Sequence, residues 1–261
     1  MSSRCAIVTG AARGIGAAVV AELVHEGLTV LAVDSCLDDP ALGYALAGKE
    51  ELAAVEDAGR GRVKAFVADV RDRAALLDIV EYAERRHGRL DVAVAAAGVI
   101  AGGEALWETP ESAYDVLMDV NVRGVLNLAA AAVPAMLRAP SPRQGRFVAL
   151  ASAAGHRGLW HLAAYSAAKH AVVGLVKGLA ADLEGTGVTA VAVSPGATRT
   201  AMLDATADLY GLADVAELAR HQLVRRVLEP SEVAAGVSWL CSERASGVTG
   251  TVLRVDGGFT T

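Results

Sequence analysis

The sequence predicts a single α/β domain, 1–261, with a doubly wound parallel sheet of seven strands and helices on both faces. Short β-branched runs alternate with longer Ala- and Leu-rich segments along the whole chain, and this alternation requires crossover connections between parallel strands. Apolar residues make up 53% of the chain but aromatic residues only 4%. The core must therefore consist mainly of Ala, Val and Leu, which suits helices packed on a buried parallel sheet. A length of 261 residues fits one large domain better than two small ones.

Each expected element follows from a local pattern. The β-branched runs predict strands at Cys5–Thr9, Thr29–Asp34, Val63–Ala68, Val92–Ala96, Arg146–Ala151, Thr189–Ser194 and Val252–Val255. The segments between them predict helices near 15–26, 48–58, 73–87, 111–138, 163–185 and 231–242. Two connections are unusually long: 35–48 carries acids, Pro and Gly, and 199–229 contains short amphipathic pieces and no strand. Connections of this length in a compact domain are often lids or binding loops.

Charge, cysteine content and hydropathy limit the classes of function. The net charge of −6, with Lys and Arg scattered, argues against a nucleic-acid partner. Cys5, Cys36 and Cys241 show no metal-ligand spacing, and His156 and His161 have no Cys or carboxylate partner at such spacing, so no metal is expected. The N-terminus lacks a signal-peptide pattern, and no apolar stretch reaches the roughly 18 residues that span a bilayer. We expect a soluble, cytoplasmic protein with no membrane partner.

The first strand runs directly into a glycine-rich turn that opens a helix. Glycines at such a turn let the backbone approach a pyrophosphate, which then lies on the positive helix N-terminus. An ordinary strand-to-helix turn is the alternative, but strand, glycines and helix follow in the order that a dinucleotide-binding Rossmann fold requires. The residues expected to contact the dinucleotide here are Gly10, Arg13, Gly14, Ile15 and Gly16.

Acidic residues end the second and third strands. Asp34 stands where a carboxylate accepts hydrogen bonds from the adenosine ribose and repels a 2′-phosphate, which selects NAD over NADP. A capping role for Asp34 in the following turn is the alternative. Asp69 and Val70 close the third strand, where a carboxylate could reach the adenine amino group. Asp69 could equally cap the helix that starts near Asp72.

A Tyr and a Lys one helical turn apart carry the expected chemistry. Tyr165 and Lys169 are four residues apart in a predicted helix, so both side chains lie on one face. An isolated Tyr titrates near pH 10, and a neighbouring ammonium together with an oxidised nicotinamide would lower that pKa. Ser152 ends the preceding strand and can donate a hydrogen bond to a substrate oxygen. The three residues predict acid/base catalysis of hydride transfer to or from an alcohol or ketone.

These motifs together resemble the short-chain dehydrogenase/reductase family over essentially the whole chain. Beyond the glycine turn and the Tyr/Lys pair, the chain shows Asn121 in Asp119-Val120-Asn121 and a terminal Asp256-Gly257-Gly258. The resemblance implies a catalytic tetrad of Asn121, Ser152, Tyr165 and Lys169. In the family the matching Asn supports a proton-relay water through its helix backbone, and the Lys also binds the nicotinamide ribose.

The resemblance also extends the expected cofactor site and includes one departure. Pro195-Gly196 follows the sixth strand, and in the family the next segment holds the nicotinamide carboxamide, which points to Thr198 and Thr200. The family usually has Asn-Asn-Ala-Gly after the fourth strand, where this chain has Ala95-Ala96-Ala97-Gly98. Gly98 still lets the backbone pass close to the cofactor, and we expect small apolar groups to replace the missing amides.

The insert 35–48 is similar to that of the mycofactocin-associated branch of this family. It reads DDPALGYALA before a helix that opens KEEL, and the segments AAAGVIAGG and SPGATRTAML also resemble that branch. The resemblance implies a tightly held NAD whose electrons leave through mycofactocin, a small peptide-derived redox carrier. An insert beside Asp34 could fold over the adenosine half and slow its release. The alternative is an insert that caps the sheet edge, with ordinary NAD turnover.

The substrate is expected between the catalytic residues and a lid formed by 199–229. The candidate walls are Ala154, His156, Trp160, Met202, Leu203 and Tyr210. Mostly apolar walls suggest a hydrophobic alcohol or ketone. A 3-oxoacyl-thioester reductase and a non-catalytic nucleotide-sensing protein are the alternatives. Helices 111–138 and 163–185 are Ala-rich on more than one face, so they could pack against another subunit. The family resemblance implies a homotetramer, and a dimer is the alternative.

Overall fold

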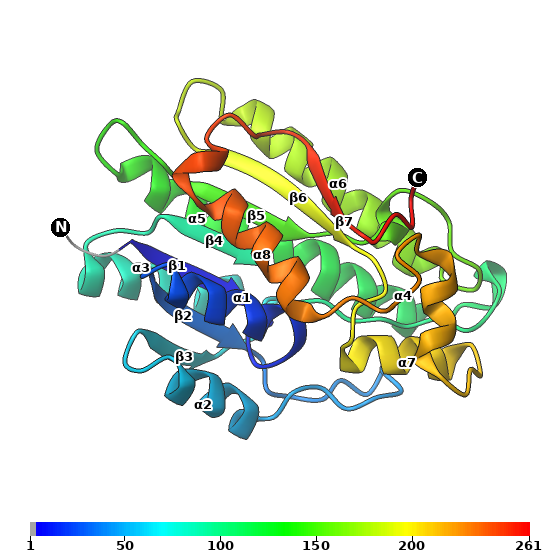
Figure 1. Cartoon of the computed structure of the whole chain (residues 1–261). Coiled ribbons are helices and arrows are strands. Elements are labelled where there is room, and N and C mark those ends of the chain that lie inside the picture. Colours follow the sequence, from blue (N-terminus) through cyan, green and yellow to red (C-terminus); the bar gives the residue numbers. More distant parts are fainter. Residues whose placement is uncertain (1–3) are drawn as a thin grey trace.

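The computed structural model describes residues 4–261 and shows a seven-stranded, fully parallel sheet (Figure 1). The strands are β1 (Cys5–Thr9), β2 (Thr29–Asp34), β3 (Val63–Val67), β4 (Val92–Ala95), β5 (Arg146–Leu150), β6 (Thr189–Pro195) and β7 (Val252–Val255). Their order in the sheet is β3-β2-β1-β4-β5-β6-β7. The chain therefore works outward to one side from β1 and then to the other side from β4. The predicted fold class is confirmed, and every predicted strand is present to within one residue at each end.

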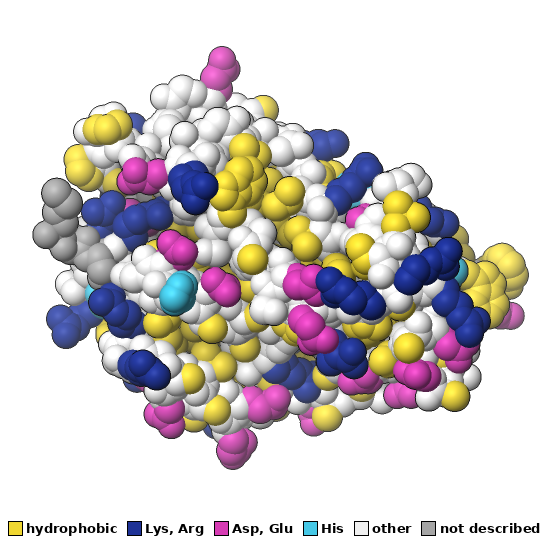
Figure 2. Space-filling view, viewed as in Figure 1, with side chains coloured by type: hydrophobic (Ala, Val, Ile, Leu, Met, Phe, Trp, Pro, Cys, Tyr) yellow, Lys and Arg dark blue, Asp and Glu magenta, His cyan; other side chains and the backbone are white. Residues whose placement is uncertain are grey.

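Helices cover both faces of this sheet. They are α1 (Gly14–His25), α2 (Lys49–Ala58), α3 (Arg73–His87), α4 (Glu111–Met118), α5 (Gly124–Arg138), α6 (Ala163–Asp182), α7 (Ala201–Leu209) and α8 (Pro230–Cys241). One face packs on α1, α2 and α8, and the other packs on α3, α5 and α6. Charged side chains of both signs are interspersed over the visible surface of the molecule (Figure 2).

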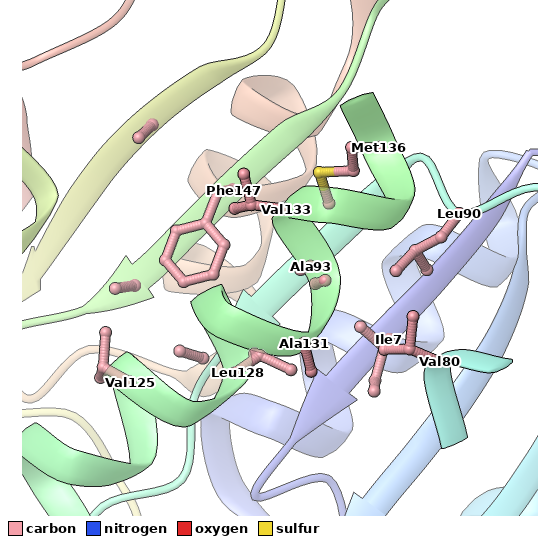
Figure 3. Close-up of a cluster of buried hydrophobic side chains, with 14 of the residues drawn as sticks. Ile7, Val80, Leu90, Ala93, Val125, Leu128, Ala131, Val133, Met136 and Phe147 are labelled. Carbon is pink, nitrogen blue, oxygen red and sulfur yellow. The ribbon is translucent and has the colours of Figure 1, made fainter. Parts of the chain in front are cut away.

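Each strand contributes alternate side chains to two hydrophobic cores because successive residues of a strand point to opposite faces. In β1, Ile7 joins the core under α3, α5 and α6, whereas Val8 joins the core under α1 and α8. Figure 3 shows the first of these cores, where Leu128 and Met136 of α5 lie over Phe147 of β5 and the neighbouring strands. Small residues such as Ala and Val let the helices approach the sheet closely, in line with the composition.

The helix predicted at 111–138 is interrupted. It divides into α4, a π-helical turn at Asp119–Arg123, and α5. The apolar periodicity continues through the turn, so the sequence pattern does not reveal it. Glu111–Arg138 is long and apolar enough to cross a membrane, contrary to the expectation that no stretch is, but 56% of its most apolar part is buried inside the fold. This helix is a core element of the domain.

The two ends of the segment 199–229 lie next to each other beyond the end of β6. Thr198 pairs with Leu228 in an isolated bridge, and the amide of Arg199 donates to the Leu228 carbonyl at 2.8 Å. Between these ends lie α7 and a 3-10 helix, η4 (Val215–His221). The predicted short helical pieces without a strand are therefore present, and they lie at the end of the molecule where the strands point (Figure 1).

Asp91, just before β4, links β1, β4 and β5 at the end of the sheet where these strands begin. Its carboxylate accepts the Cys5 amide at 2.8 Å and the Arg89 guanidinium, and its carbonyl accepts the Arg146 amide. The residue is 4% exposed. Asp91→Ala should lower the free energy of unfolding by about 3 kcal/mol, because a buried amide and a guanidinium lose their acceptor. Urea unfolding measures this change.

The matched control is Glu81→Ala, which breaks only the surface pair with Arg85. Its cost should stay below about 0.5 kcal/mol, since exposed pairs contribute little. Equal losses in the two variants would contradict the role assigned to Asp91.

Candidate active site

The turn after β1 brings the backbone unusually close to neighbouring segments. Gly10 has φ +65°, and a Cβ there would lie 2.6 Å from the Ala97 Cα. A Cβ on Gly16 would lie 1.9 Å from the Gly10 carbonyl oxygen. Helix α1 then begins at Gly14 with no side-chain cap and no acid in its first turn. Its free N–H groups and positive end therefore suit an anionic group such as a pyrophosphate.

A cleft of about 180 Å³ opens at this turn. The predicted cofactor residues that line it are Gly10, Arg13, Gly14, Ile15, Gly16, Asp34, Asp69, Val70, Gly98 and Thr200. A second cavity, of about 840 Å³, shares Ile15, Gly98 and Thr200 with the first. Pro195, Gly196 and Thr198 line this second cavity. Because the two cavities share these walls they adjoin each other, and a dinucleotide with its pyrophosphate in the first would have its nicotinamide near the second, so the residues fit such a cofactor.

The two acidic residues at the cleft have different surroundings. Asp34 accepts the amides of Ala12 at 3.1 Å and Cys36 at 3.2 Å, and these bonds hold its carboxylate at the cleft wall. Burial opposes the ionisation of Asp69, but hydrogen bonds from Arg71 outweigh it and hold the pKa of Asp69 below its usual value. Asp72 is the residue that caps α3. The alternative role of Asp69 as that cap is therefore wrong.

The insert 35–48 spans the cleft, and we call it the strap. On one side Arg71 binds Asp39 at 2.8 Å, and Arg13 donates to the Ala45 carbonyl at 2.7 Å. On the other side the amide of Ile100, after β4, donates to the Tyr44 hydroxyl at 3.1 Å. The strap runs along the edge of the sheet toward α7 (Figure 1). It thus reaches well beyond the adenosine end at which the sequence placed it.

The strap also packs on the catalytic end of the molecule. Leu42, Tyr44 and Leu46 contact a hydrophobic cluster that contains Ile100 and Tyr165. Burial raises the pKa of Tyr44, so its hydroxyl stays protonated at neutral pH. The strap therefore connects the two ends of the dinucleotide site.

Tyr165 and Lys169 lie on the first turns of α6 and are 6% and 4% exposed. Burial raises the pKa of Tyr165 to about 12, although a hydrogen bond with the Ser152 side chain opposes this rise. Burial lowers the pKa of Lys169 to about 8. The Lys169 ammonium donates to the Leu150 carbonyl at 3.0 Å and lies 5.8 Å from the centre of the Tyr165 ring. In the protein alone the phenol is protonated at neutral pH, and a cation stands beside it.

Asn121 lies within the π-helical turn and is fully buried. Its side chain accepts the Val99 amide at 2.9 Å and donates to the Val99 carbonyl at 3.0 Å. A Cβ on Gly98 would lie 2.9 Å from the Asn121 Oδ1 and 3.4 Å from the Lys169 Nζ. A larger residue there would have to displace the end of the Asn121 side chain, and Asn121 reaches the site next to Lys169.

The alanines that replace the family amides pack as expected. Ala95 is 3% exposed in the core under α5. The amide of Ala97 is bound by the Thr9 hydroxyl at 3.3 Å, which links β1 to the segment after β4. A side chain from the neighbouring strand thus supplies the polar link.

Three of the four predicted catalytic residues and most of the predicted substrate walls line the second cavity, whereas Asn121 does not. Ser152, Tyr165 and Lys169 line it, together with Trp160, Met202, Leu203 and Tyr210. The lid 199–229 supplies three of these walls, as expected.

Two predicted walls are wrong. Ala154 is fully buried in the cluster behind Tyr165, and His156 turns away from the cavity to bond the Ser194 hydroxyl at 2.8 Å. Four further walls of this cavity were not predicted from the sequence: Arg157, Arg220, His221 and Phe259. They come from three distant segments, and no local pattern identifies them.

Comparison with known proteins places these features in one family. The family described as Enoyl-(Acyl carrier protein) reductase matches residues 10–260. The A-factor type gamma-butyrolactone 1'-reductase (1S-forming) of Streptomyces virginiae is 37% identical over 100% of this chain and 96% of its own. The 3-oxoacyl-[acyl-carrier-protein] reductase of Thermotoga maritima is 32% identical over 99% and 98%. The structure of carveol dehydrogenase from Mycobacterium avium in complex with NAD is similar with a TM-score of 0.92, at 28% identity over 99% and 98% of the two chains.

The tight turn predicts the effect of adding one methyl group. Gly16→Ala should weaken NAD binding about tenfold or more, because the new Cβ must displace the Gly10 carbonyl and with it the turn. Fluorescence titration measures the dissociation constant. Gly247→Ala is the control, since a Cβ there meets nothing within 4 Å, and its affinity should equal that of the original protein. Unchanged affinity in Gly16→Ala would show that the turn does not hold the cofactor.

Proposed function

The chain belongs to the short-chain dehydrogenase/reductase family, and from this premise we propose that it interconverts a hydrophobic secondary alcohol and its ketone. The observation that carries the proposal is the buried Tyr165 hydroxyl, bonded to Ser152 and close to Lys169, in the wall of a large apolar cavity. A phenol in this position can exchange a proton with a substrate oxygen.

NAD is the cofactor of this oxidoreductase. The glycine turn and the open end of α1 suit the pyrophosphate. Asp34 at the cleft wall suits the adenosine ribose hydroxyls and disfavours a 2′-phosphate. When bound, the nicotinamide accepts a hydride from the alcohol or donates one to the ketone.

Side chains of the protein then position the substrate and transfer the proton. Ser152 donates a hydrogen bond to the substrate oxygen and orients it toward Tyr165. In ketone reduction the Tyr165 hydroxyl gives its proton to that oxygen, and in alcohol oxidation the phenolate takes it. The Lys169 ammonium stabilises the phenolate and opposes the effect of burial on its pKa. Asn121 is a positioning residue, because its bonds to Val99 hold the π-helical turn in place.

We further propose that the strap retains NAD and that electrons leave through mycofactocin. Three ties support retention: Arg71 to Asp39, Arg13 to the Ala45 carbonyl, and Ile100 to Tyr44. They join the strap to the segments after β1, β3 and β4, so we expect that some of them must break before a bound dinucleotide leaves. The similarity of the strap sequence to the mycofactocin-associated branch supports the choice of acceptor.

A 3-oxoacyl-thioester reductase is the second candidate. The relative from Thermotoga maritima, 32% identical, carries that name, and the cavity of about 840 Å³ has room for a long acyl chain. A non-catalytic nucleotide sensor is less well supported, because Tyr165 and Lys169 are both present and share one cavity.

We also propose a cytoplasmic homotetramer. Tyr114 of α4 and Leu126 of α5 are 47% and 52% exposed, and such apolar side chains on two helices of one layer suit a subunit interface. Sedimentation velocity at micromolar concentration tests the proposal, which a monomer would contradict.

Tyr165→Phe should lower kcat/KM about 1,000-fold, because the proton donor is removed while the ring remains. NAD affinity should change little. Steady-state kinetics with a hydrophobic secondary alcohol and an artificial electron acceptor measure the effect, since in this direction the same Tyr165 oxygen takes the proton. Tyr210→Phe is the matched control: it removes a hydroxyl of the lid that donates to the Trp160 carbonyl, and activity should fall less than about threefold. Undiminished turnover in Tyr165→Phe would overturn the proposed chemistry.

The same site predicts a pH profile. Alcohol oxidation should rise with pH as Tyr165 loses its proton. In Lys169→Met the midpoint of that rise should move to higher pH, since the cation that favours the phenolate is absent. A midpoint that stays in place would exclude this role for Lys169.

Arg71→Ala should speed NAD release about tenfold, because the link between the strap and Asp69 is lost. Stopped-flow fluorescence measures the dissociation rate, with Arg85→Ala as a surface control. Denaturing the purified protein should release NAD, and turnover should require an artificial electron acceptor. An empty site with rapid turnover of free NAD would contradict retention by the strap.

A further inference from the structure

The outer end of the substrate cavity carries basic side chains. Arg157, Arg220 and His221 line it there, and we call these three residues the basic rim. All three are exposed, whereas Tyr165 and Lys169 are buried. The cavity therefore has the buried Tyr165 and Lys169 at its inner end and the exposed basic rim at its opening.

Phe259 orients the Arg157 side chain, and no carboxylate neutralises its charge within the described residues. Its guanidinium lies 5.1 Å from the centre of the Phe259 ring and donates to the Phe259 carbonyl at 3.4 Å. Within residues 4–261 no carboxylate forms an ion pair with it. His221 packs edge-on against the same ring at 5.8 Å. The C-terminal segment thus holds two members of the rim side by side.

Arg220 has one acidic neighbour. Its guanidinium lies 3.7 Å from the Glu217 carboxylate, and Glu217 is the acidic residue among those that line the cavity. Two arginines therefore face one carboxylate at the rim, in a chain whose net charge is −6. The local charge is opposite in sign to that of the whole chain.

The part of the cavity between Tyr165 and the basic rim is apolar. Leu159, Leu162, Met202 and Leu212 line it. An apolar chain can fill this part, but a charged group would lose its hydration there. At the exposed rim a charged group keeps much of its water, and an anion gains the attraction of the arginines.

We propose that the substrate is an amphipathic molecule whose far end is an anion, a carboxylate or a phosphate, held at the basic rim. Its hydroxyl or carbonyl lies at Tyr165 and its apolar chain crosses the middle of the cavity. This inference rests on the proposed function and specifies the substrate class for the same site. A carboxylate would belong to a free oxo or hydroxy acid, and a phosphate to a thioester on a phosphopantetheine arm.

Paired substrates test the proposal. A long-chain oxo acid is compared with its methyl ester, and a 3-oxoacyl phosphopantetheine thioester with the pantetheine thioester that lacks the phosphate. For at least one pair kcat/KM should favour the anionic member about five- to tenfold, the size expected of exposed charge contacts. The preference should appear in KM and shrink in high salt, because salt screens exposed charges. The pair that shows it identifies the source of the anion.

Arg157→Gln should reduce that ratio about threefold or more, and Arg157→Lys should preserve most of it. Arg62→Gln is the matched control, because Arg62 also donates to a single carbonyl, that of Gly27, but lies elsewhere. The ratio compares two substrates of one variant, so a change in the active fraction does not affect it. Equal kcat/KM within both pairs, or a ratio that Arg157→Gln leaves unchanged, would overturn the proposal. Absence of turnover with all four ketones would instead overturn the proposed function.

Discussion

All seven strands of the sheet run in the same direction, so the carboxyl ends of β1, β2, β4, β5 and β6 meet along one edge. Because β1 leads toward β2 and β4 leads the other way, the loops after β1 and β4 diverge and leave a cleft between them. The glycine turn, Asp34 and Ser152 each follow one of these strands. Their proximity is a consequence of the parallel register, and the helices that carry Asn121 and Tyr165 are placed by packing on the same sheet.

Burial shifts the pKa values of Tyr165 and Lys169 in opposite directions. It raises the pKa of Tyr165 to about 12 and lowers that of Lys169 to about 8, because a low-dielectric environment disfavours both charged forms. The Ser152 and Leu150 hydrogen bonds partly offset this cost. A positively charged nicotinamide would add to the effect of the Lys169 ammonium on the phenol. The site thus depends on a balance between burial and charge that a bound cofactor can shift.

Three segments outside the sheet complete the site. The strap crosses the cleft, the lid 199–229 closes over the second cavity, and the C-terminal segment brings Phe259 to its opening. Arg71 and Ile100 bind the strap, and the bridge between Thr198 and Leu228 joins the two ends of the lid. In the proposed function the sheet positions the catalytic residues, whereas these segments would determine how the cofactor leaves and which substrate enters.

Local patterns in the sequence determined the strands, the glycine turn and the spacing of Tyr165 and Lys169, because each depends on residues close together in the chain. The π-helical turn at Asp119–Arg123 escaped prediction, since one extra residue in a turn hardly alters the apolar periodicity. Ala154 and His156 were misplaced because closeness to Ser152 in sequence does not say which side of a loop faces the cavity. The reach of the strap to Ile100 and the basic rim were decided only by tertiary structure. They join side chains from distant segments, and packing of the whole domain brings those segments together.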